Sequence, residues 1–464
     1  MNEQTLSKFN SFSPTDYRYS VEELKPYLSE EAFIKYKAKV ESALVKILAK
    51  RGLCSQEITN EIIRACNQVT AQEVYDEERR IKHDIRALVN VIRRRVSSKA
   101  KPYIHLAATS YDIVDTANVL RYKDATEKVV LPDMIELEKI WIELARKEKD
   151  TLQIGRTHGQ HALPITFGFA LAQYVQRWGD RILQLKNVVN NLVGKFSGAV
   201  GACNACSLFF NDPEKFEMEL LSELGLKPAK ISTQIVPPEP LVDFTHAIIS
   251  SFGVLANFAD DMRHLQRSEI GEVGESFEEE QVGSSTMPQK RNPINFENVK
   301  SMWKAFMPRM ITIYMDQISE HQRDLTNSCS ARYIPELLVT FDSSARRIKK
   351  VSSKLQVDKN NMQRNFRQNR DKIIAEPLYI LLASLGHPDA HEYVRRLATE
   401  SLKSNKPLLE IVMEDKNLKP YLEKFTKSQR EIISDPSKYI GIASKKTEEI
   451  TKLWEEQFGA NYGR

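Results

Sequence analysis

The sequence is poor in cysteine, with five in 464 residues. So few cysteines in so long a chain do not build a disulfide framework, which favours a reducing compartment and predicts a cytoplasmic protein. Cys203 and Cys206 form a single C-x-x-C without a second pair, so we interpret them as small buried residues rather than as a zinc or redox site. No cluster of residues has metal-ligand spacing, and we expect neither a metal nor an organic cofactor.

Long apolar runs are also missing. None approaches the roughly 20 residues that span a bilayer, and residues 1–12 are polar and lack the apolar segment of a signal peptide. We therefore expect no association with a membrane. The formal net charge of +5 is small and dispersed, and the short run 93–95 is more typical of a solvated helix face than of a nucleic-acid groove. A mildly basic chain favours encounter with anionic small substrates.

Neither a long alternating strand pattern nor a short internal repeat is present. Helical patterns dominate instead, with breaks expected at Gly52 and near Thr70 and a strong helical stretch that carries His83 and Asp84 expected within 71–96. Five long helices, with little Gly or Pro inside them, are predicted over about 131–149, 171–192, 244–265, 294–313 and 334–355. The length excludes one simple core.

These patterns predict an all-α protein with three helical domains. The N-terminal domain is expected over 1–100, and a smaller C-terminal domain over 357–464. Between them, the five long helices over 101–356 predict an elongated bundle.

The most informative stretch is Gly283–Pro293, GSSTMPQKRNP. Its end has the composition of a helix start, because Asn292 is a good N-cap and Pro293 suits the first helical position. Apolar residues then recur at helical spacing: Val299, Met302, Phe306, Met310 and Ile313. Unpaired N–H groups and the positive end of the helix dipole would lie beside Lys290, which predicts a site for an anion.

The residues before this stretch have the character of a mobile flap. Gly271, Gly274 and Gly283 bracket an acidic, polar run over 272–281 that has little to bury. A serine brought by such a flap to a pocket lined by a cation is a candidate reactive group. From spacing alone, the alternative is an ordinary interhelical turn with a surface lysine.

A second candidate is His158, in the sequence G-R-T-H-G-Q-H at 155–161. We expect it in a loop of small residues before Pro164 and the helix that follows. A lone histidine is more often structural than catalytic, so the spacing alone does not decide its role.

Both stretches match motifs of a known superfamily. Residues 283–293 resemble the signature of the fumarase/aspartase superfamily, which consists of lyases that release fumarate, and G-R-T-H resembles a second motif. This resemblance implies that His158 is catalytic, and it leaves His161 as a structural neighbour.

Within the superfamily, the chain is most similar to the adenylosuccinate lyase family, over nearly its whole length. Motifs of this family occur in order at 17–20, 82–84, 109–112, 232–234, 323–332 and 435–441. The resemblance implies that the following residues bind the substrate: Arg18, Tyr19, Lys82, His83, Asp84, Thr109, Ser110, Asp112, Gln234, Arg323, Ser328 and Arg332. A 5′-phosphate favours guanidinium and hydroxyl donors. Taken singly, the arginines are more typical of a soluble surface, and it is the surrounding motifs that favour a binding role.

The resemblance also implies a reaction. A succinyl group leaves as fumarate from a purine amino nitrogen or an imidazole carboxamide nitrogen. Such an elimination requires a base, an acid and stabilisation of a carbanion-like state. We assign Ser284 as the base and His158 as the acid. Lys290 and Asn292 would stabilise the developing charge, and Glu297 would orient the histidine.

Two positions depart from the family pattern. Gln289 stands where a histidine is usual, whereas argininosuccinate lyases carry a glutamine there, and Pro238 replaces an arginine. The alternatives are therefore another fumarate-releasing lyase, with argininosuccinate as the leading substrate, or a helical scaffold without activity. The resemblance further implies a homotetramer in which several subunits build each active site. Motifs scattered over some 300 positions on long helices are consistent with that arrangement.

Overall fold

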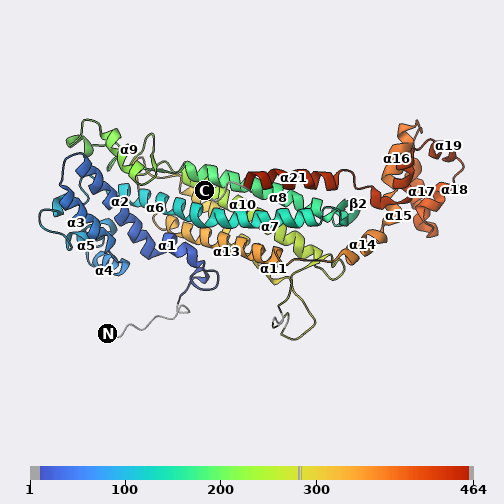
Figure 1. Cartoon of the computed structure of the whole chain (residues 1–464), viewed down its shortest axis with the longest axis horizontal. Coiled ribbons are helices and arrows are strands. Elements are labelled where there is room, and N and C mark those ends of the chain that lie inside the picture. Colours follow the sequence, from blue (N-terminus) through green and yellow to red (C-terminus); the bar gives the residue numbers. More distant parts are fainter. Residues whose placement is uncertain (1–10, 279, 281–282, 284, 459–464) are drawn as a thin grey trace. The chain divides into compact units, whose positions relative to one another are not determined.

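The computed structural model describes residues 11–278, 280, 283 and 285–458. It is predominantly helical, which confirms the predicted all-α class (Figure 1). The α-helices of the first half of the chain are α1 (Lys25–Leu28), α2 (Glu30–Lys50), α3 (Gln56–Asn67), α4 (Ala71–Ile81), α5 (Asp84–Arg93), α6 (Ser110–Ala125), α7 (Leu131–Lys147), α8 (Phe167–Asn190) and α9 (Pro213–Glu223). Those of the second half are α10 (Glu239–Leu265), α11 (Ile294–Phe306), α12 (Arg309–Met315), α13 (Ile334–Ser352), α14 (Lys359–Gln368), α15 (Arg370–Ile373), α16 (Ala375–Ser384), α17 (Ala390–Ser404), α18 (Leu408–Glu414), α19 (Lys419–Leu422), α20 (Lys427–Ser434) and α21 (Ala443–Phe458).

Shorter elements connect these helices. A π-helical turn, Thr126–Val130, joins α6 to α7. The strands are β1 (Leu152–Thr157), β2 (Gln160–Thr166), β3 (Val193–Gly194), β4 (Lys227–Pro228), β5 (Val273–Gly274) and β6 (Gln356–Val357). They pair as β1 with β2 and β5 with β6, both antiparallel, and as β3 with β4, which are parallel.

The chain folds into two compact units, each assembled from three segments. The first unit comprises residues 1–135, 180–255 and 301–346, and the second comprises 136–179, 256–300 and 347–464. The division passes through five helices: α7, α8, α10, α11 and α13. These are the five long helices that the sequence predicts, although the fourth ends at Phe306 and resumes as α12 after Pro308. The division into domains at residues 100 and 356 remains a prediction.

Helix α2 is the principal scaffold of the first unit, where it contacts α3, α4, α6 and α9. Ser29 caps it by accepting a hydrogen bond from the N–H of Ala32. Its apolar residues recur every three or four positions, so Val40, Leu44 and Leu48 are all fully buried. Each such side chain contributes about 1.5–3 kcal/mol relative to an exposed one.

The predicted break at Gly52 is confirmed, because α2 ends at Lys50, and Thr70 caps the start of α4. The helical stretch expected within 71–96 is present but is interrupted at Lys82 and His83. Lys82 adopts a left-handed conformation (φ 57°) that ends α4, and the imidazole Nδ1 of His83 accepts the N–H of Arg86 at the start of α5. The stretch is therefore two helices joined at the Lys82–His83 pair.

Aromatic rings fill the interior of the second unit. The ring of Trp141 lies 5.8 Å from Trp178 and 4.5 Å from Phe258, measured between centroids. Gly179 has no room for a side chain, since an added Cβ would lie 2.5 Å from the ring of Trp454 on α21. Helix α10 is long and apolar enough to cross a membrane by length and composition, but 67% of its most apolar window is buried, as in a core helix.

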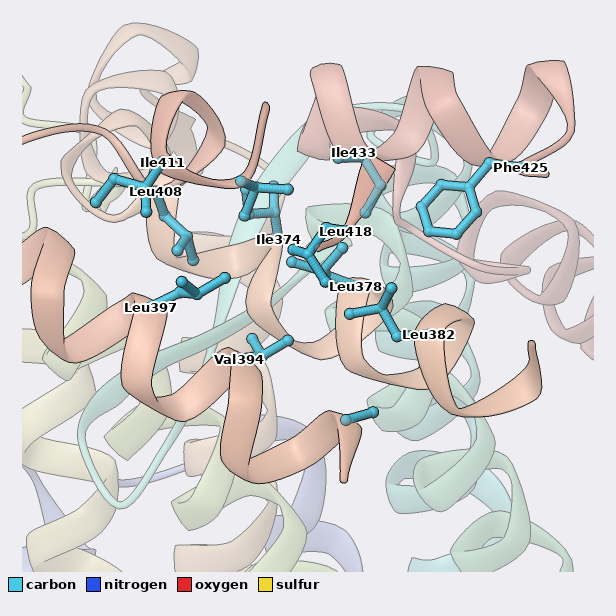
Figure 2. Close-up of a cluster of buried hydrophobic side chains, with 12 residues drawn as sticks. Ile374, Leu378, Leu382, Val394, Leu397, Leu408, Ile411, Leu418, Phe425 and Ile433 are labelled. Atoms are coloured by element: carbon cyan, nitrogen blue, oxygen red, sulfur yellow. The ribbon is translucent and has the colours of Figure 1, made fainter. Parts of the chain in front are cut away.

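The C-terminal part of the second unit has its own apolar cluster, built from α16, α17, α18, α20 and the segments that connect them (Figure 2). Figure 2 shows aliphatic side chains from these helices converging on one interior. Its members are Ile374, Leu378, Leu382, Ala390, Val394, Leu397, Leu408, Ile411, Val412, Leu418, Phe425 and Ile433.

Candidate active site

The predicted site residues divide between the two units. His158, Lys290, Asn292 and Glu297 belong to the second unit, and all the predicted substrate-binding residues belong to the first. Ser284 lies outside the described residues.

His158 lies at the tip of a β-hairpin, not in the loop that the sequence predicts. Strands β1 and β2 pair from Leu152 with Thr166 to Thr157 with Gln160, so His158 and Gly159 form a two-residue turn. Both have positive φ, 53° and 74°, as in a type I′ hairpin turn. The turn leaves the imidazole of His158 exposed. An exposed ring on a tight turn is available to a group outside its own hairpin.

A buried carboxylate fixes the hairpin beneath this histidine. Glu272 is fully buried and accepts hydrogen bonds from Arg156 (2.5 Å), Gln153 (2.8 Å) and Asn365 (2.8 Å). A buried charge that is fully hydrogen-bonded holds its partners in one geometry. Nearby, Nδ1 of His161 lies 2.8 Å from the side-chain nitrogen of Asn369. The imidazole of His161 is thus engaged within the unit, in keeping with the structural role expected for it.

The two limbs of the signature loop touch at Gly283. The side-chain nitrogen of Asn292 donates to the carbonyl of Gly283 (3.1 Å), and the N–H of Lys290 donates to the carbonyl of Met287 (3.0 Å). An added Cβ on Gly283 would lie 2.0 Å from the carbonyl oxygen of Lys290, so only glycine permits this approach. The side chain of Lys290 is exposed.

The start of α11 differs from the prediction. Asn292 does not cap the helix, and the first N–H groups are not free for an external anion. The carboxylate of Glu275, 3% exposed, accepts the N–H groups of Asn295 (2.9 Å) and Phe296 (3.0 Å). The protein thus supplies its own anion at the positive end of the dipole. Burial is the main cause of a raised pKa at Glu275.

Glu297 lies one turn into α11, and its side chain is exposed. Within the described part of a single chain, no hydrogen bond joins it to His158. The orienting role of Glu297 therefore stays a prediction.

In the first unit, Thr109 is the N-cap of α6 and Ser110–Asp112 form its first turn, which a buried carboxylate anchors. Asp112 is fully buried, and its Oδ2 accepts the N–H of Thr109 (2.8 Å). Its Oδ1 pairs with the fully buried Lys195 and also accepts the N–H groups of Ser197 and Gly198. Because these contacts occupy the carboxylate, Asp112 supports the start of α6, whereas Thr109 and Ser110 are only half-buried.

The segment that carries Gln234 is fixed by neighbouring loops. The N–H of Val236 donates to Asp115 (3.0 Å), and the hydroxyls of Ser232 and Ser197 are 2.6 Å apart. Gly201 has φ +77°, and an added Cβ would lie 2.0 Å from the carbonyl of Ser232. Burial raises the pKa of Asp115 to about 6. Gln234 itself is half-buried.

Arg323, Ser328 and Arg332 occupy an irregular segment before α13. Arg323 donates from Nη2 to the hydroxyl of Tyr111 (2.7 Å). Ser328 and Arg332 are exposed. Asp324 stabilises the segment locally by accepting the N–H and hydroxyl of Thr326.

The N-terminal candidates lie on short capped turns. Arg18 is exposed, and the N–H groups of Arg18 and Tyr19 both donate to the carbonyl of Pro14. In the second motif, Lys82 and His83 occupy the junction of α4 and α5. Asp84 lies 3.5 Å from Nζ of Lys37, whose pKa is lowered chiefly by burial.

One residue that the sequence did not single out is His105. Its ring nitrogen lies 2.6 Å from Glu41, and its N–H donates to the same carboxylate (3.1 Å). Burial opposes the charged ring, but Glu41 outweighs it, so the pKa of His105 is raised. Glu41, 2% exposed, lies within the apolar residues of α2. A carboxylate among buried apolar residues needs a polar partner. Glu41 was therefore the feature of the sequence that could have indicated a buried partner such as His105. Among the described residues, no group of three or more His, Cys, Asp or Glu is arranged to hold a metal.

Comparisons with known proteins agree with these motifs. A sequence model of the family described as "Lyase" matches residues 3–306, and one described as "Adenylosuccinate lyase C-terminal" matches residues 319–439. The chain is 39% identical over 453 residues to a protein named adenylosuccinate lyase from Pyrococcus abyssi, covering 96% of this chain and 98% of that one. For the protein of the same name from Pyrococcus horikoshii, the identity is 38% over 451 residues, with coverage of 96% and 98%.

Solved structures share the fold. The crystal structure of 3-carboxy-cis,cis-muconate lactonizing enzyme from Pseudomonas putida matches with a TM-score of 0.84, covering 96% of this chain and 99% of that one. The sequence identity to that enzyme is 23%, so this similarity concerns the fold alone.

Proposed function

This chain belongs to the lyase family and, within it, to the adenylosuccinate lyases, and on that premise we propose that it eliminates fumarate from adenylosuccinate to give AMP. The same chemistry would release fumarate from the succinylated aminoimidazole carboxamide ribotide. One observation carries the proposal: the full-length similarity extends into the C-terminal family match, which favours this branch over other fumarate-releasing lyases. A cytoplasmic location is part of the same proposal.

The proposed reaction breaks one C–N bond and forms one C=C bond. Ser284 takes the proton from the carbon beside a carboxylate, and His158 gives a proton to the departing nitrogen. Lys290 and Asn292 stabilise the carbanion-like state, since a cation and an amide donor favour developing negative charge. The exposed imidazole on its rigid hairpin and the exposed Lys290 support this assignment, because both are open to a substrate.

The first unit supplies candidate contacts to the nucleotide. Arg18, Arg323 and Ser328 offer guanidinium and hydroxyl donors that suit a 5′-phosphate. Pro238 leaves one arginine contact of the family pattern unfilled.

A spectrophotometric panel of succinylated substrates tests the function. We expect release of fumarate from adenylosuccinate and little from argininosuccinate. Cleavage of argininosuccinate alone would overturn the assignment in favour of the other lyase, and no cleavage of any substrate would favour a scaffold without activity.

We further propose a homotetramer with shared active sites. An apolar face of α12 and the residues after it supports a second copy as the partner: Ile311, Met315 and Ile318 are 62%, 67% and 81% exposed. If subunits share sites, mixing the inactive His158→Ala and Ser284→Ala variants with subunit exchange restores part of the activity. The control is a mixture of His158→Ala with the variant that carries both His158→Ala and Ser284→Ala. It should stay inactive, because neither subunit supplies His158. No recovery despite demonstrated exchange would contradict shared sites.

A further inference from the structure

Tyr111 lies in the first turn of α6, at the unassigned position of the Thr109–Asp112 motif, between Ser110 and Asp112. Its half-buried ring lies under the guanidinium of Arg323, with Cζ 4.6 Å from the ring centroid. Its hydroxyl oxygen accepts a hydrogen bond from Nη2 of the same arginine, at 2.7 Å. One tyrosine therefore fixes both the plane and the edge of the guanidinium group.

This contact leaves other donors of Arg323 unused. Its Nε and Nη1 are buried and have no hydrogen-bond partner among the described residues. Buried polar groups are almost always paired, so unpaired donors on a guanidinium indicate a missing anionic partner. The Tyr111 oxygen acts as the acceptor toward Arg323, so its own O–H is left to donate as well.

Two nearby carboxylates explain why the side chain of Arg323 must be fixed in place. The charge of Arg323 reaches two carboxylates of the same unit, Asp115 and Asp316, where it lowers a pKa that burial raises. Asp115 already accepts the N–H of Val236, and Asp316 accepts the hydroxyl of Ser330 (2.8 Å). A flexible arginine close to two acids would pair with one of them. The ring and hydroxyl of Tyr111 instead keep Nε and Nη1 available.

We infer that Tyr111 holds Arg323 in place, so that Nε, Nη1 and the phenol O–H together bind the phosphate of the substrate. The inference rests on the proposed function, in which Arg323 meets the nucleotide. It adds a residue to which the family motif gives no role. These donors would bind an anionic group, and the substrate has two kinds, the phosphate and the succinyl carboxylates. The test must separate these two.

The test compares Tyr111→Phe, which keeps the ring, with Tyr111→Leu, which removes both contacts. For Tyr111→Phe we expect a KM for adenylosuccinate raised about 10-fold, as for the loss of one hydrogen bond to a charged group, and kcat within about twofold of the parent. The Kd for AMP, measured by calorimetry, should rise in parallel, while the inhibition constant of fumarate stays unchanged. Tyr111→Leu should give a larger change in the same direction.

The matched control is Tyr36→Phe, which removes a hydrogen bond of equal length, 2.7 Å, to Asp124 in the same unit. It should leave KM and AMP affinity unchanged. Arg323→Lys completes a double-mutant cycle with Tyr111→Phe, and we expect the two effects to be less than additive.

The outcomes separate the two claims. If Arg323→Lys weakens AMP binding but Tyr111→Phe does not, the inference is overturned and the proposed function stands. If Tyr111→Phe changes the inhibition constant of fumarate but not the affinity for AMP, Tyr111 and Arg323 bind a succinyl carboxylate. The phosphate assignment is then overturned. A parent protein that binds AMP through this pair without cleaving adenylosuccinate would refute the function and uphold the pair.

Discussion

Helix α6 begins within one candidate motif and α11 follows another, and both begin at a buried carboxylate, but the carboxylate comes from different places. In α6 it is Asp112, three residues after Thr109, whose N–H it accepts. In α11 it is Glu275, twenty residues before Asn295 and on the far side of the signature loop. A local cap stabilises one helix end, whereas a distant cap also ties together the two ends of a loop. The second arrangement therefore makes the loop depend on one side chain.

The two carboxylates also differ in their electrostatic partners. Asp112 is paired with the ammonium of Lys195, and both are fully buried. Glu275 accepts only neutral N–H donors among the described residues, from the backbone and side chain of Asn295 and from Phe296. An ion pair in the interior is sensitive to the loss of either partner, because the remaining charge is left without compensation. The α6 end should therefore be the more sensitive of the two to a single substitution.

The largest effect is expected for Lys195→Met, which keeps the length of the side chain but leaves Asp112 unpaired. We expect the free energy of unfolding to fall by about 3–5 kcal/mol in chemical denaturation. The control is Lys128→Met, which breaks a 2.8 Å pair with Asp124 in which the lysine is 54% exposed. That variant should lose at most about 1 kcal/mol. If the free energy of unfolding falls equally in the two variants, the buried pair contributes no more to stability than the exposed one.

A second prediction concerns Asp115, three residues after Asp112 on α6, whose pKa burial raises to about 6 from an ordinary 3.8. Since the folded chain binds this proton more tightly, the group's contribution to stability is full below pH 3.8 and is lost as the pH rises through 6. Asp115→Asn lacks this loss. Between pH 4 and pH 7.5, the free energy of unfolding of the variant should therefore rise relative to that of the parent by at most about 3 kcal/mol.

The control for this prediction has the opposite sign. Hydrogen bonds with Thr326 hold the pKa of Asp324 at about 2, so that carboxylate stabilises the fold at neutral pH and loses this effect as the pH falls. Asp324→Asn should be less stable than the parent at pH 7, and the difference should narrow toward pH 3. Denaturation curves at several pH values measure both variants. If the stabilities of Asp115→Asn and the parent change in parallel with pH, the prediction for Asp115 is contradicted.

The same two helix ends show what the sequence could predict. The spacing of Thr109 and Asp112 is a local signal, and long helices such as α8 and α10 follow from apolar periodicity over many turns. Glu275 could not be predicted as the cap of α11, because nothing in local sequence specifies a partner across an irregular loop. Asn292 satisfied the local rule for an N-cap, but its side chain bonds Gly283 instead.

The hairpin that carries His158 was missed for a related reason. Its strands have only six and seven residues, and Gly155 and Pro164 interrupt any alternation of apolar and polar residues. What fixes the hairpin is the tertiary partner Glu272, which bonds Gln153 and Arg156. The break at Lys82 was equally hidden, since lysine is an ordinary helix residue and its left-handed conformation depends on the junction that it forms. The candidate catalytic residues came from the motifs, whereas their supporting contacts came from the structure.

The last prediction tests whether the distant cap serves the loop as well as the helix. Glu275→Ala removes the acceptor for Asn295 and Phe296 and should cost about 1–2 kcal/mol of stability. Because Lys290 and Asn292 lie between the tied ends, we also expect turnover to fall by about 100-fold, as for a small misplacement of reacting groups. The matched control is Thr426→Ala at the start of α20, which removes a local cap that accepts the N–H of Gln429. It should lose a similar amount of stability and keep its turnover. If both variants keep turnover while losing equal stability, the Glu275 carboxylate serves only the helix.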